Sequence, residues 1–242
     1  KFFKKKIKIT KKKIHEYKDF YQSYFSTHKK KELFVDAKLA LSKDYFTISK
    51  KSKWITNQSS RKRAHLIRSE YDAIVSTSKS INNDNSILNC RLNGFDNRKP
   101  DLIVIDRHFS IKKNLDIFKN NIQRKIFIVI LKKNIKKKFN FKNKNIKFIE
   151  VKSLTSKSDF NYLFSLIKKY GYNRVLIESG LTFFNKLLLN KFIYNLYVFQ
   201  TLYNLKKEGK NNASNSFIKK LKFQKKVKVN LNSDSLYKIK VK

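Results

Sequence analysis

The segment Glu178-Ser179-Gly180-Leu181-Thr182 carries the clearest chemical signal in the sequence. It follows a short run, 174–177, that predicts a buried strand, and it precedes a predicted helix. This order places a carboxylate at the edge of a sheet, beside the free N–H groups of a helix N-terminus, which suit a phosphate. In a simpler interpretation, Gly180 only allows a tight turn and Glu178 caps the helix.

A second candidate site surrounds the only tryptophan of the chain. Ser52 and Trp54 precede a predicted helix that carries Arg68. A ring in this position can stack on a flat heterocycle, although a tryptophan is more often an ordinary core anchor. The chain has 8 Arg against 50 Lys. A retained arginine therefore indicates a need for the planar guanidinium, as in phosphate binding.

A polar segment, 80–91, follows a predicted strand and is itself predicted to be a loop. It holds one carboxylate, Asp84, and one arginine, Arg91, seven residues apart. The two side chains could simply form a salt bridge. Together with Arg68 they could instead bracket an anionic, hydroxylated ligand.

Other catalytic chemistries lack their usual motifs. The sequence contains no G-x-G-x-x-G, G-x-S-x-G or G-x-x-x-x-G-K-[ST] pattern. The four histidines do not have metal-ligand spacing, so no metal is expected. Cys90 is the only cysteine. A single cysteine excludes an intramolecular disulfide and a cysteine-based zinc cluster, and it fits the reducing cytoplasm.

The elements that must position these residues alternate between strands and helices. Strands are predicted at 34–41, 72–77, 102–105, 126–131, 146–151, 174–177 and 195–201, helices at 59–70, 159–169 and 182–190, and a hairpin within 222–242. This order predicts an α/β domain with a mostly parallel central sheet, flanked by helices, and a C-terminal antiparallel hairpin. Ligands in such sheets bind beyond the carboxyl ends of the strands.

Residues 1–32 differ from the rest of the chain. A short alternating piece, 7–9, is followed by a polar, aromatic-rich segment, 14–25, that could be helical. The apolar residues of this region are too few to form a core alone.

The charge of the chain is high but dispersed. Against 17 Asp and Glu, 58 Lys and Arg give a net charge of +41 over 242 residues. Hydrophobic residues make up 40% and aromatics 14%, which excludes a disordered polycation. We expect weak, nonspecific binding to polyanions at low salt and no specific nucleic acid, with a basic polyanion-binding protein as an alternative function. No uncharged run approaches the roughly 18 residues that a membrane span needs.

In their order, these segments resemble the reductase domain of the bifunctional riboflavin-biosynthesis deaminase/reductase, RibD, over about residues 33 to 205. The resemblance rests on residues 38–44, 52–56, 68, 72–75, 84–91, 102–106 and 178–182. It implies a dihydrofolate-reductase-like fold and the NADPH-dependent reduction of 5-amino-6-(5-phosphoribosylamino)uracil to 5-amino-6-(5-phosphoribitylamino)uracil. Another pyrimidine or pteridine reductase of the same fold is the alternative. The resemblance also implies a homodimer, a reductase domain at 33–242, and a tail of a preceding deaminase domain plus linker at 1–32.

The resemblance further implies roles for individual residues. Substrate would be bound by Ser52, Arg68, Leu88, Arg91 and Glu178. NADPH would be bound by Ala40, Trp54, Ser80, Asp84, Arg107, Gly180, Leu181, Thr182, Phe183, Phe184, Asn185 and Lys186. Asp84, near the nicotinamide, is the expected catalytic residue, and Arg107 would contact the 2′-phosphate. Arg68 and Arg91 would neutralise the ribose phosphate.

Four positions depart from the family pattern. Tyr45 stands where the family has Gly, Asn85 and Ser86 replace an Asp-Pro pair, and Leu181 replaces Pro. The zinc signature of the deaminase, H-x-E with P-C-x-x-C, is absent. These residues are therefore not expected to deaminate.

Overall fold

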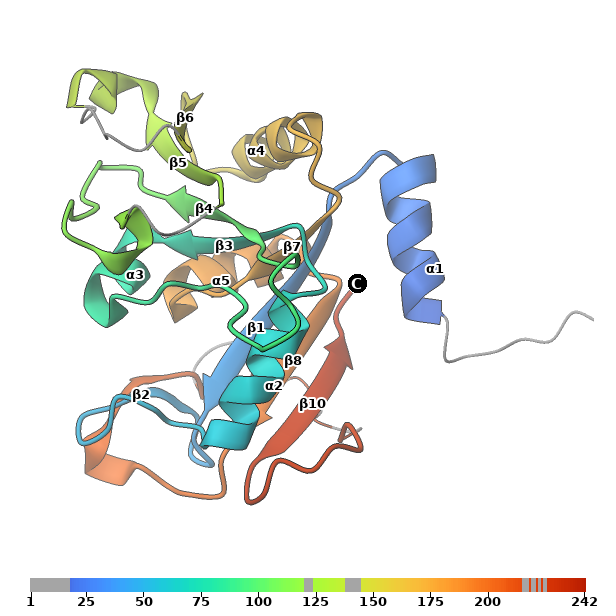
Figure 1. Ribbon diagram of the computed structural model, residues 1–242, viewed down its shortest axis with the longest axis vertical. Coiled ribbons are helices and arrows are strands. Elements are labelled where there is room, and N and C mark those ends of the chain that lie inside the picture. The colour runs from blue at the N-terminus through green and yellow to red at the C-terminus, as the bar shows by residue number, and fades with distance from the viewer. Residues whose placement is uncertain are drawn as a thin grey trace, which may run out of the picture.

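One eight-stranded sheet organises the protein (Figure 1). The computed structural model describes residues 18–119, 124–137, 145–214, 218, 221, 223 and 226–242. The strands of the sheet are β1 (Phe34–Leu41), β3 (Ala73–Thr77), β4 (Asp101–Ile105), β5 (Ile126–Leu131), β6 (Ile146–Val151), β7 (Arg174–Ile177), β8 (Asn195–Gln200) and β10 (Ser235–Lys240). Their order is β10-β8-β1-β7-β3-β4-β5-β6, and all neighbours are parallel except β10, which runs antiparallel to β8.

Helices cover both faces of this sheet. The main helices are α2 (Gln58–Arg68), α3 (Ser78–Asp84), α4 (Lys157–Lys169) and α5 (Leu181–Leu189). Successive strand residues point to opposite faces. Ile74 and Leu176 accordingly pack in one core with residues of α2 and α3, whereas Val75 and Ile177 pack in the other with residues of α4 and α5. The predicted fold class, a mostly parallel central sheet flanked by helices with a C-terminal antiparallel hairpin, is confirmed. Among the described residues of 222–242, a single antiparallel bridge joins Lys226 to Tyr237, and β10 makes its longer antiparallel ladder with β8.

Smaller elements complete the chain. They are the helical segments α1 (Lys18–Tyr24), η2 (Phe25–Lys29), η3 (Asp116–Phe118), η4 (Lys132–Lys137) and η5 (Lys206–Glu208), and the strands β2 (Phe46–Ser49) and β9 (Gly209–Asn212). The antiparallel pair β2–β9, here called the flap, forms a second sheet. The predicted helix over 14–25 is observed from Lys18 onward, and the pieces at 7–9 and 14–17 lie outside the described residues.

The segment 80–91 begins as a helix, where the sequence predicts a loop throughout. Thr77 ends β3 and caps α3 by accepting a hydrogen bond from the backbone N–H of Ser80. Ile81 is fully buried against the sheet. Capping and burial together stabilise a short helix whose Ser- and Asn-rich composition alone favours a loop.

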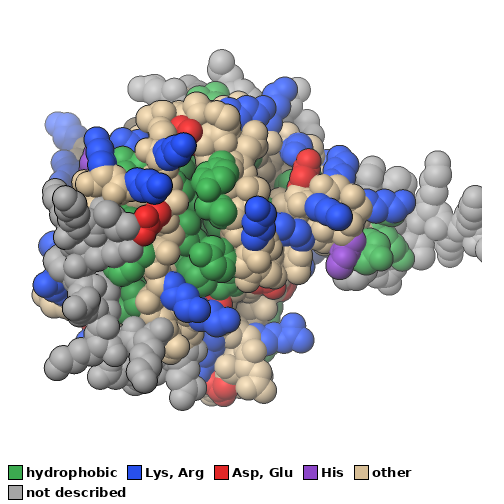
Figure 2. Space-filling model, turned by 90° about the horizontal axis from the view of Figure 1, so that it is seen from above, with side chains coloured by type: hydrophobic (Ala, Val, Ile, Leu, Met, Phe, Trp, Pro, Cys, Tyr) green, Lys and Arg blue, Asp and Glu red, His purple; other side chains and the backbone are tan. Residues whose placement is uncertain are grey.

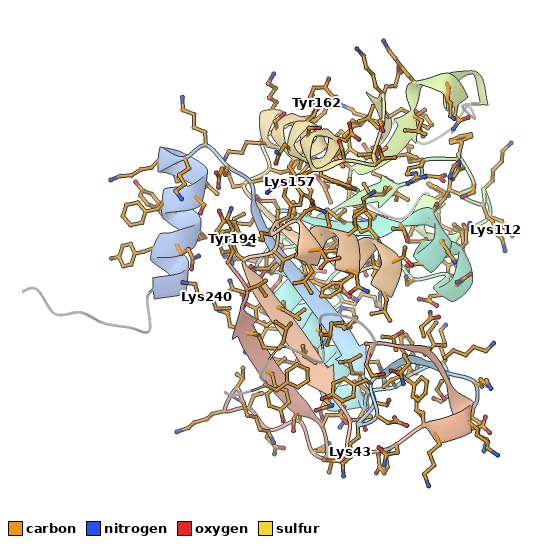
Figure 3. All side chains as sticks on the ribbon, turned by 180° about the vertical axis from the view of Figure 1, so that it is seen from behind. Lys43, Lys112, Lys157, Tyr162, Tyr194 and Lys240 are labelled. Atoms are coloured by element: carbon orange, nitrogen blue, oxygen red, sulfur yellow. The ribbon has the colours of Figure 1, made fainter. Side chains whose placement is uncertain are left out.

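The helical segment η2, which follows α1, contacts Tyr194 just before β8; Figure 3 labels Tyr194. The Ser26 hydroxyl lies 3.2 Å from the Tyr194 hydroxyl, which itself donates to Glu32 at 2.9 Å. These bonds tie the residues before β1 to the start of β8.

Cationic side chains are dispersed over the face of the molecule that Figure 2 shows. On the face seen in Figure 2, Lys and Arg side chains alternate with apolar and polar ones and do not gather into a single patch. No helix in the described part of the chain combines the length and the apolar character needed to cross a membrane.

Candidate active site

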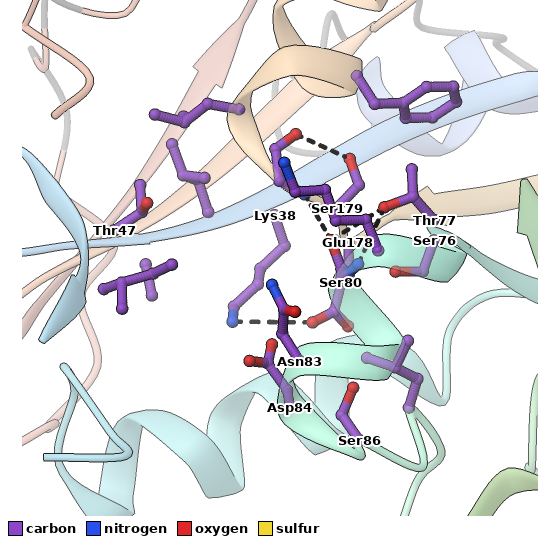
Figure 4. A pocket seen from close by; sticks show the side chains of 18 of the residues that line it. Lys38, Thr47, Ser76, Thr77, Ser80, Asn83, Asp84, Ser86, Glu178 and Ser179 are labelled. Atoms are coloured by element: carbon purple, nitrogen blue, oxygen red, sulfur yellow. Dashed lines mark hydrogen bonds and ion pairs between the residues drawn. The ribbon is translucent and has the colours of Figure 1, made fainter. Parts of the chain in front are cut away.

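A cleft of about 1430 Å³ opens at the carboxyl ends of β1, β3, β4 and β7 (Figure 4). These strand ends meet at one edge because the four strands are consecutive parallel neighbours. Residues of α2, α3 and α5, the loop after β4, and the flap line the remaining walls. The cleft therefore lies where ligands bind in parallel sheets.

Most of the predicted site residues line this one cleft. They are Ala40, Trp54, Arg68, Ser80, Asp84, Leu88, Arg91, Arg107, Glu178, Gly180, Leu181, Thr182, Phe183, Asn185 and Lys186. Ser52 and Phe184 do not line it. Ser52 is exposed and bonds to the backbone of Trp54. Phe184 is 1% exposed within the core, because its position on α5 faces the sheet.

Glu178 is buried at the floor of the cleft between two cations. Arg68 donates from Nε to Oε1 at 2.6 Å and from Nη2 to Oε2 at 2.9 Å. The Lys38 ammonium lies 3.7 Å from Oε2. Burial raises the pKa of Glu178, but Arg68 and Lys38 outweigh it, so the pKa falls from 4.5 to about 2. The carboxylate is thus ionised at neutral pH.

Lys38 is a site residue that the sequence analysis did not identify. It lies on β1 with its side chain 18% exposed, and it points into the cleft toward Glu178 (Figure 4). Burial and the neighbouring Arg68 lower its pKa, although Glu178 opposes this. The sequence does carry a signal for Lys38, because it is a lysine inside a predicted strand and a buried charge needs a partner.

Arg68 is expected to neutralise the ribose phosphate, but its guanidinium already binds groups of the protein. Both of its bonds to Glu178 are made by one edge of the guanidinium, and Nη1 donates to the Asn89 carbonyl at 3.2 Å. Arg91 is exposed, and its Nη1 donates to the Asn89 side chain at 2.7 Å. Arg91 is therefore the more available of the two guanidinium groups for an anionic ligand.

Two helix N-termini meet beside Gly180. The Gly180 N–H donates to the Ser80 hydroxyl at 3.0 Å, which links the start of α5 to the start of α3. No side chain in the described part of the chain caps α5. The first backbone N–H groups of this helix remain available to an anion such as a phosphate.

The loop after β4 is fixed by Asp106. This buried carboxylate accepts bonds from the Ser78 hydroxyl, the Ser110 N–H and the Ile111 N–H, each at 2.8 Å. The bonds hold the loop that carries Arg107 along the cleft. Both oxygens of Asp106 are engaged within the protein, so this carboxylate does not neutralise the neighbouring Arg107.

Trp54 forms an exposed wall of the cleft. The residue is 51% exposed, with the Arg61 guanidinium 5.0 Å and the Lys53 ammonium 5.4 Å from its ring centre. Its exposure argues against the alternative of a core anchor. A ring held by cations on the protein side can stack on a flat ligand.

Asp84 lies on the cleft wall at the end of α3 (Figure 4). Desolvation in the cleft raises its pKa, and nearby Lys53 opposes this. No hydrogen bond or ion pair joins its carboxylate to another residue that the structure describes. Nor do those residues include a group of three or more His, Cys, Asp or Glu that could hold a metal ion.

At three of the positions that depart from the family pattern, the local backbone conformation explains which residue types fit. Tyr45 has a backbone φ of +68° and Asn85 one of +44°. Such left-handed values explain why glycine suits the first position, and asparagine is among the residues that tolerate them. Leu181 is the first residue of α5, where proline is also favoured.

Replacing Gly209 with alanine is expected to destabilise the flap. A Cβ at Gly209 would overlap the Phe46 ring, which packs directly on this backbone. We expect a loss of about 1 to 3 kcal/mol in the free energy of unfolding, measured by urea denaturation. The double variant Phe46→Ala/Gly209→Ala should cost less than the sum of the single variants. Strictly additive losses would contradict this contact.

Comparison with known proteins finds one family. The chain matches the family described as RibD C-terminal domain over residues 35–201. It is 26% identical over 165 residues to the riboflavin biosynthesis protein RibD of Aquifex aeolicus, covering 68% of this chain and 43% of that protein. The chain thus spans less than half the length of this curated relative.

Solved structures share the fold. One is a diaminohydroxyphosphoribosylaminopyrimidine deaminase/5-amino-6-(5-phosphoribosylamino)uracil reductase from Thermotoga maritima, with a TM-score of 0.73 and 20% identity, covering 94% of this chain and 62% of that one. Another is the riboflavin biosynthesis reductase Rib7 of Saccharomyces cerevisiae, with a TM-score of 0.66 and 17% identity, covering 93% of this chain and 98% of that one.

Proposed function

Because the chain belongs to the RibD C-terminal domain family, we propose that it reduces 5-amino-6-(5-phosphoribosylamino)uracil to 5-amino-6-(5-phosphoribitylamino)uracil with NADPH. The observation that carries the proposal is a single cleft lined by Trp54, Asp84 and Glu178 at the carboxyl ends of the strands. The proposal includes a cytoplasmic homodimer, with residues 33–242 as the reductase domain and 1–32 as the tail of a deaminase domain plus linker.

The residues of the cleft fit a phosphorylated dinucleotide. The uncapped start of α5 suits the pyrophosphate, Trp54 suits a flat ring, and Arg107 with Lys112 suits the 2′-phosphate. When bound, NADPH supplies the hydride. The protein must hold the two reactants together and keep water away from them.

The other residues of the cleft floor suit the pyrimidine and its opened, imine-like ribose. Reduction of the C1′=N bond needs a hydride on C1′ and a proton on nitrogen. Asp84 faces the cleft from the end of α3, and this position makes it our candidate to deliver that proton. Desolvation raises its pKa, which favours this role. Glu178 stays ionised and, with Lys38, offers both acceptors and donors to the polar edge of the pyrimidine.

The test is NADPH consumption with 5-amino-6-(5-phosphoribosylamino)uracil supplied directly. We expect stoichiometric formation of the ribitylamino product, with no turnover of dihydrofolate or pterins. Turnover of a folate or pterin substrate alone would favour another reductase of the same fold. Nanomolar nucleic-acid binding that survives physiological salt, without turnover, would favour the polyanion-binding alternative.

Binding of NADPH should quench the fluorescence of Trp54 and produce sensitised NADPH emission. Trp54 is the only tryptophan and lines the cleft, so energy transfer reports on this site alone. Fluorescence titration measures the effect. The Trp54→Phe variant should bind NADPH more weakly, as measured by calorimetry. In the fluorescence titration it should give no sensitised emission. Tight NADPH binding without any change in tryptophan emission would place the cofactor elsewhere.

A further inference from the structure

Arg124 is a buried arginine that has no carboxylate partner among the residues that the structure describes. It precedes β5 and is 6% exposed. Its guanidinium donates to the carbonyl oxygens of Leu88 at 2.7 Å and Pro100 at 3.3 Å, and to that of Ile87. No carboxylate of the described residues lies within ion-pair distance of it, and Asp101 acts on it only at longer range. Burying such a charge is unfavourable, so its retention needs a reason.

The carbonyl groups that Arg124 binds belong largely to one segment of the cleft wall. Residues 87–91 carry Leu88 and Arg91, which both line the cleft. Leu88 is held at a φ of +53°, a conformation that leucine rarely adopts and that persists only where surrounding contacts enforce it. The bond from Arg124 to the Leu88 carbonyl acts on this strained residue itself.

The same segment is fixed from its other side by α2. The Asn89 carbonyl lies 2.8 Å from Nδ1 of His65 and accepts from Nη1 of Arg68 at 3.2 Å. Arg124 and α2 therefore clamp residues 87–91 between them. The exposed guanidinium of Arg91 is presented to the cleft from this clamped backbone.

Arg68, Arg91 and Arg124 also create an excess of positive charge around residues 87–91. Burial, with Arg68 and Arg91, lowers the pKa of Arg124 to about 10, so it stays protonated at neutral pH. Burial and the same two arginines lower the pKa of His65 to about 4. Glu178 pairs with Arg68 and Lys38, so it does not neutralise Arg91 or Arg124. A phosphate dianion would be stabilised here.

We propose that Arg124 is a positioning residue for the phosphate of the substrate. It holds residues 87–91 in the strained conformation that presents Arg91, and it adds a buried positive charge behind this segment. The inference rests on the proposed function and assigns part of the substrate affinity to a side chain outside the cleft lining. Its effect should be confined to ligands that carry the phosphate.

The experiment compares 5-amino-6-(5-phosphoribitylamino)uracil with its dephosphorylated counterpart, as ligands of the whole protein without NADPH, by calorimetry. Arg124→Met should weaken binding of the phosphorylated ligand about 10- to 100-fold, and that of the dephosphorylated one less than about threefold. Arg124→Lys keeps the charge but cannot reach three carbonyls as a planar fork. It should also lose most of the preference for the phosphorylated ligand.

Arg174→Met is the matched control. Arg174 packs on the rings of Phe34 and Tyr71 at the start of β7, the end opposite Glu178. The Arg174→Met variant should have a lower thermal midpoint of unfolding and an unchanged preference for the phosphorylated ligand. Two results would overturn the role of Arg124 and leave the proposed function standing. One is a folded Arg124→Lys protein that keeps the wild-type preference for the phosphorylated ligand, and the other is an Arg124 variant that loses equal affinity for both ligands. Wild-type protein that binds neither ligand would overturn the proposed function as well.

Discussion

Glu178→Gln is expected to lose at least about 100-fold in kcat/KM and to unfold more easily than the wild-type protein. Glutamine keeps the size of the side chain but removes the charge that compensates Arg68 and Lys38. Removing one partner from a buried ion pair costs about 3 to 5 kcal/mol, because the remaining charge is left unpaired. Steady-state kinetics and urea denaturation at neutral pH measure the two effects.

The same variant should change how stability depends on pH. The folded-state pKa of Glu178 is about 2, below the ordinary value of 4.5. Its contribution to stability is therefore present above pH 4.5 and is lost as the pH falls toward 2. Glu178→Gln should lack this part of the acid dependence. Parallel acid-stability curves for variant and wild type would contradict the buried ion pair.

Glu208→Gln is the control for this prediction. Glu208 pairs with Lys51 at 3.5 Å on the surface, where the two side chains are 40% and 76% exposed. Exposed pairs of this kind contribute less than about 1 kcal/mol. Activity and the free energy of unfolding should stay close to the wild-type values.

Lys38→Met is expected to lower kcat/KM for the pyrimidine substrate about 100-fold while leaving the affinity for NADPH nearly unchanged. Methionine can occupy the space beside the Phe199 ring, and Glu178 keeps both bonds to Arg68. Stability should therefore change little. The ammonium that faces the cleft beside Glu178 is lost, and with it a charge-assisted donor to the substrate. Kinetics with either substrate varied, together with NADPH titration, separate the effects.

Lys43→Met provides the comparison for Lys38, because Lys43 is an exposed lysine just beyond the end of β1 (Figure 3). It should behave like the wild-type protein in every assay. If Lys38→Met raised the KM for NADPH as much as that for the pyrimidine, Lys38 would belong to the cofactor site instead.

The long strands could be predicted because their apolar runs are unambiguous. Residues 34–41, 126–131 and 146–151 have the predicted boundaries. The flap could not be predicted. β9 is the polar sequence GKNN, which has no apolar residue to mark it as a strand. β2 alternates apolar and polar residues as FTIS, but it has only 4 residues, and its partner lies more than 150 residues away in the chain. Their pairing depends on tertiary contacts such as Phe46 on Gly209.

The position of the cleft could be predicted because parallel strand ends meet at one edge, and most of the residues that the resemblance assigns to the site line this cleft. The ion pairs of Glu178 within the cleft could not be predicted. Arg68 and Glu178 are 110 residues apart, and Lys38 joins them from a third element. Phe184 shows the limit of carrying over a contiguous segment, since helical periodicity turns every third or fourth side chain of α5 toward the core.

Transfer of deuterium to the substrate from NADPH that carries two deuterium atoms at nicotinamide C4, in a single turnover, tests most directly whether the cleft holds the two reactants face to face. We predict one deuterium on C1′ of 5-amino-6-(5-phosphoribitylamino)uracil for each NADPH consumed, and almost none with Glu178→Gln. Consumption of NADPH without deuterium in the product, or binding of both ligands with no transfer, would contradict it.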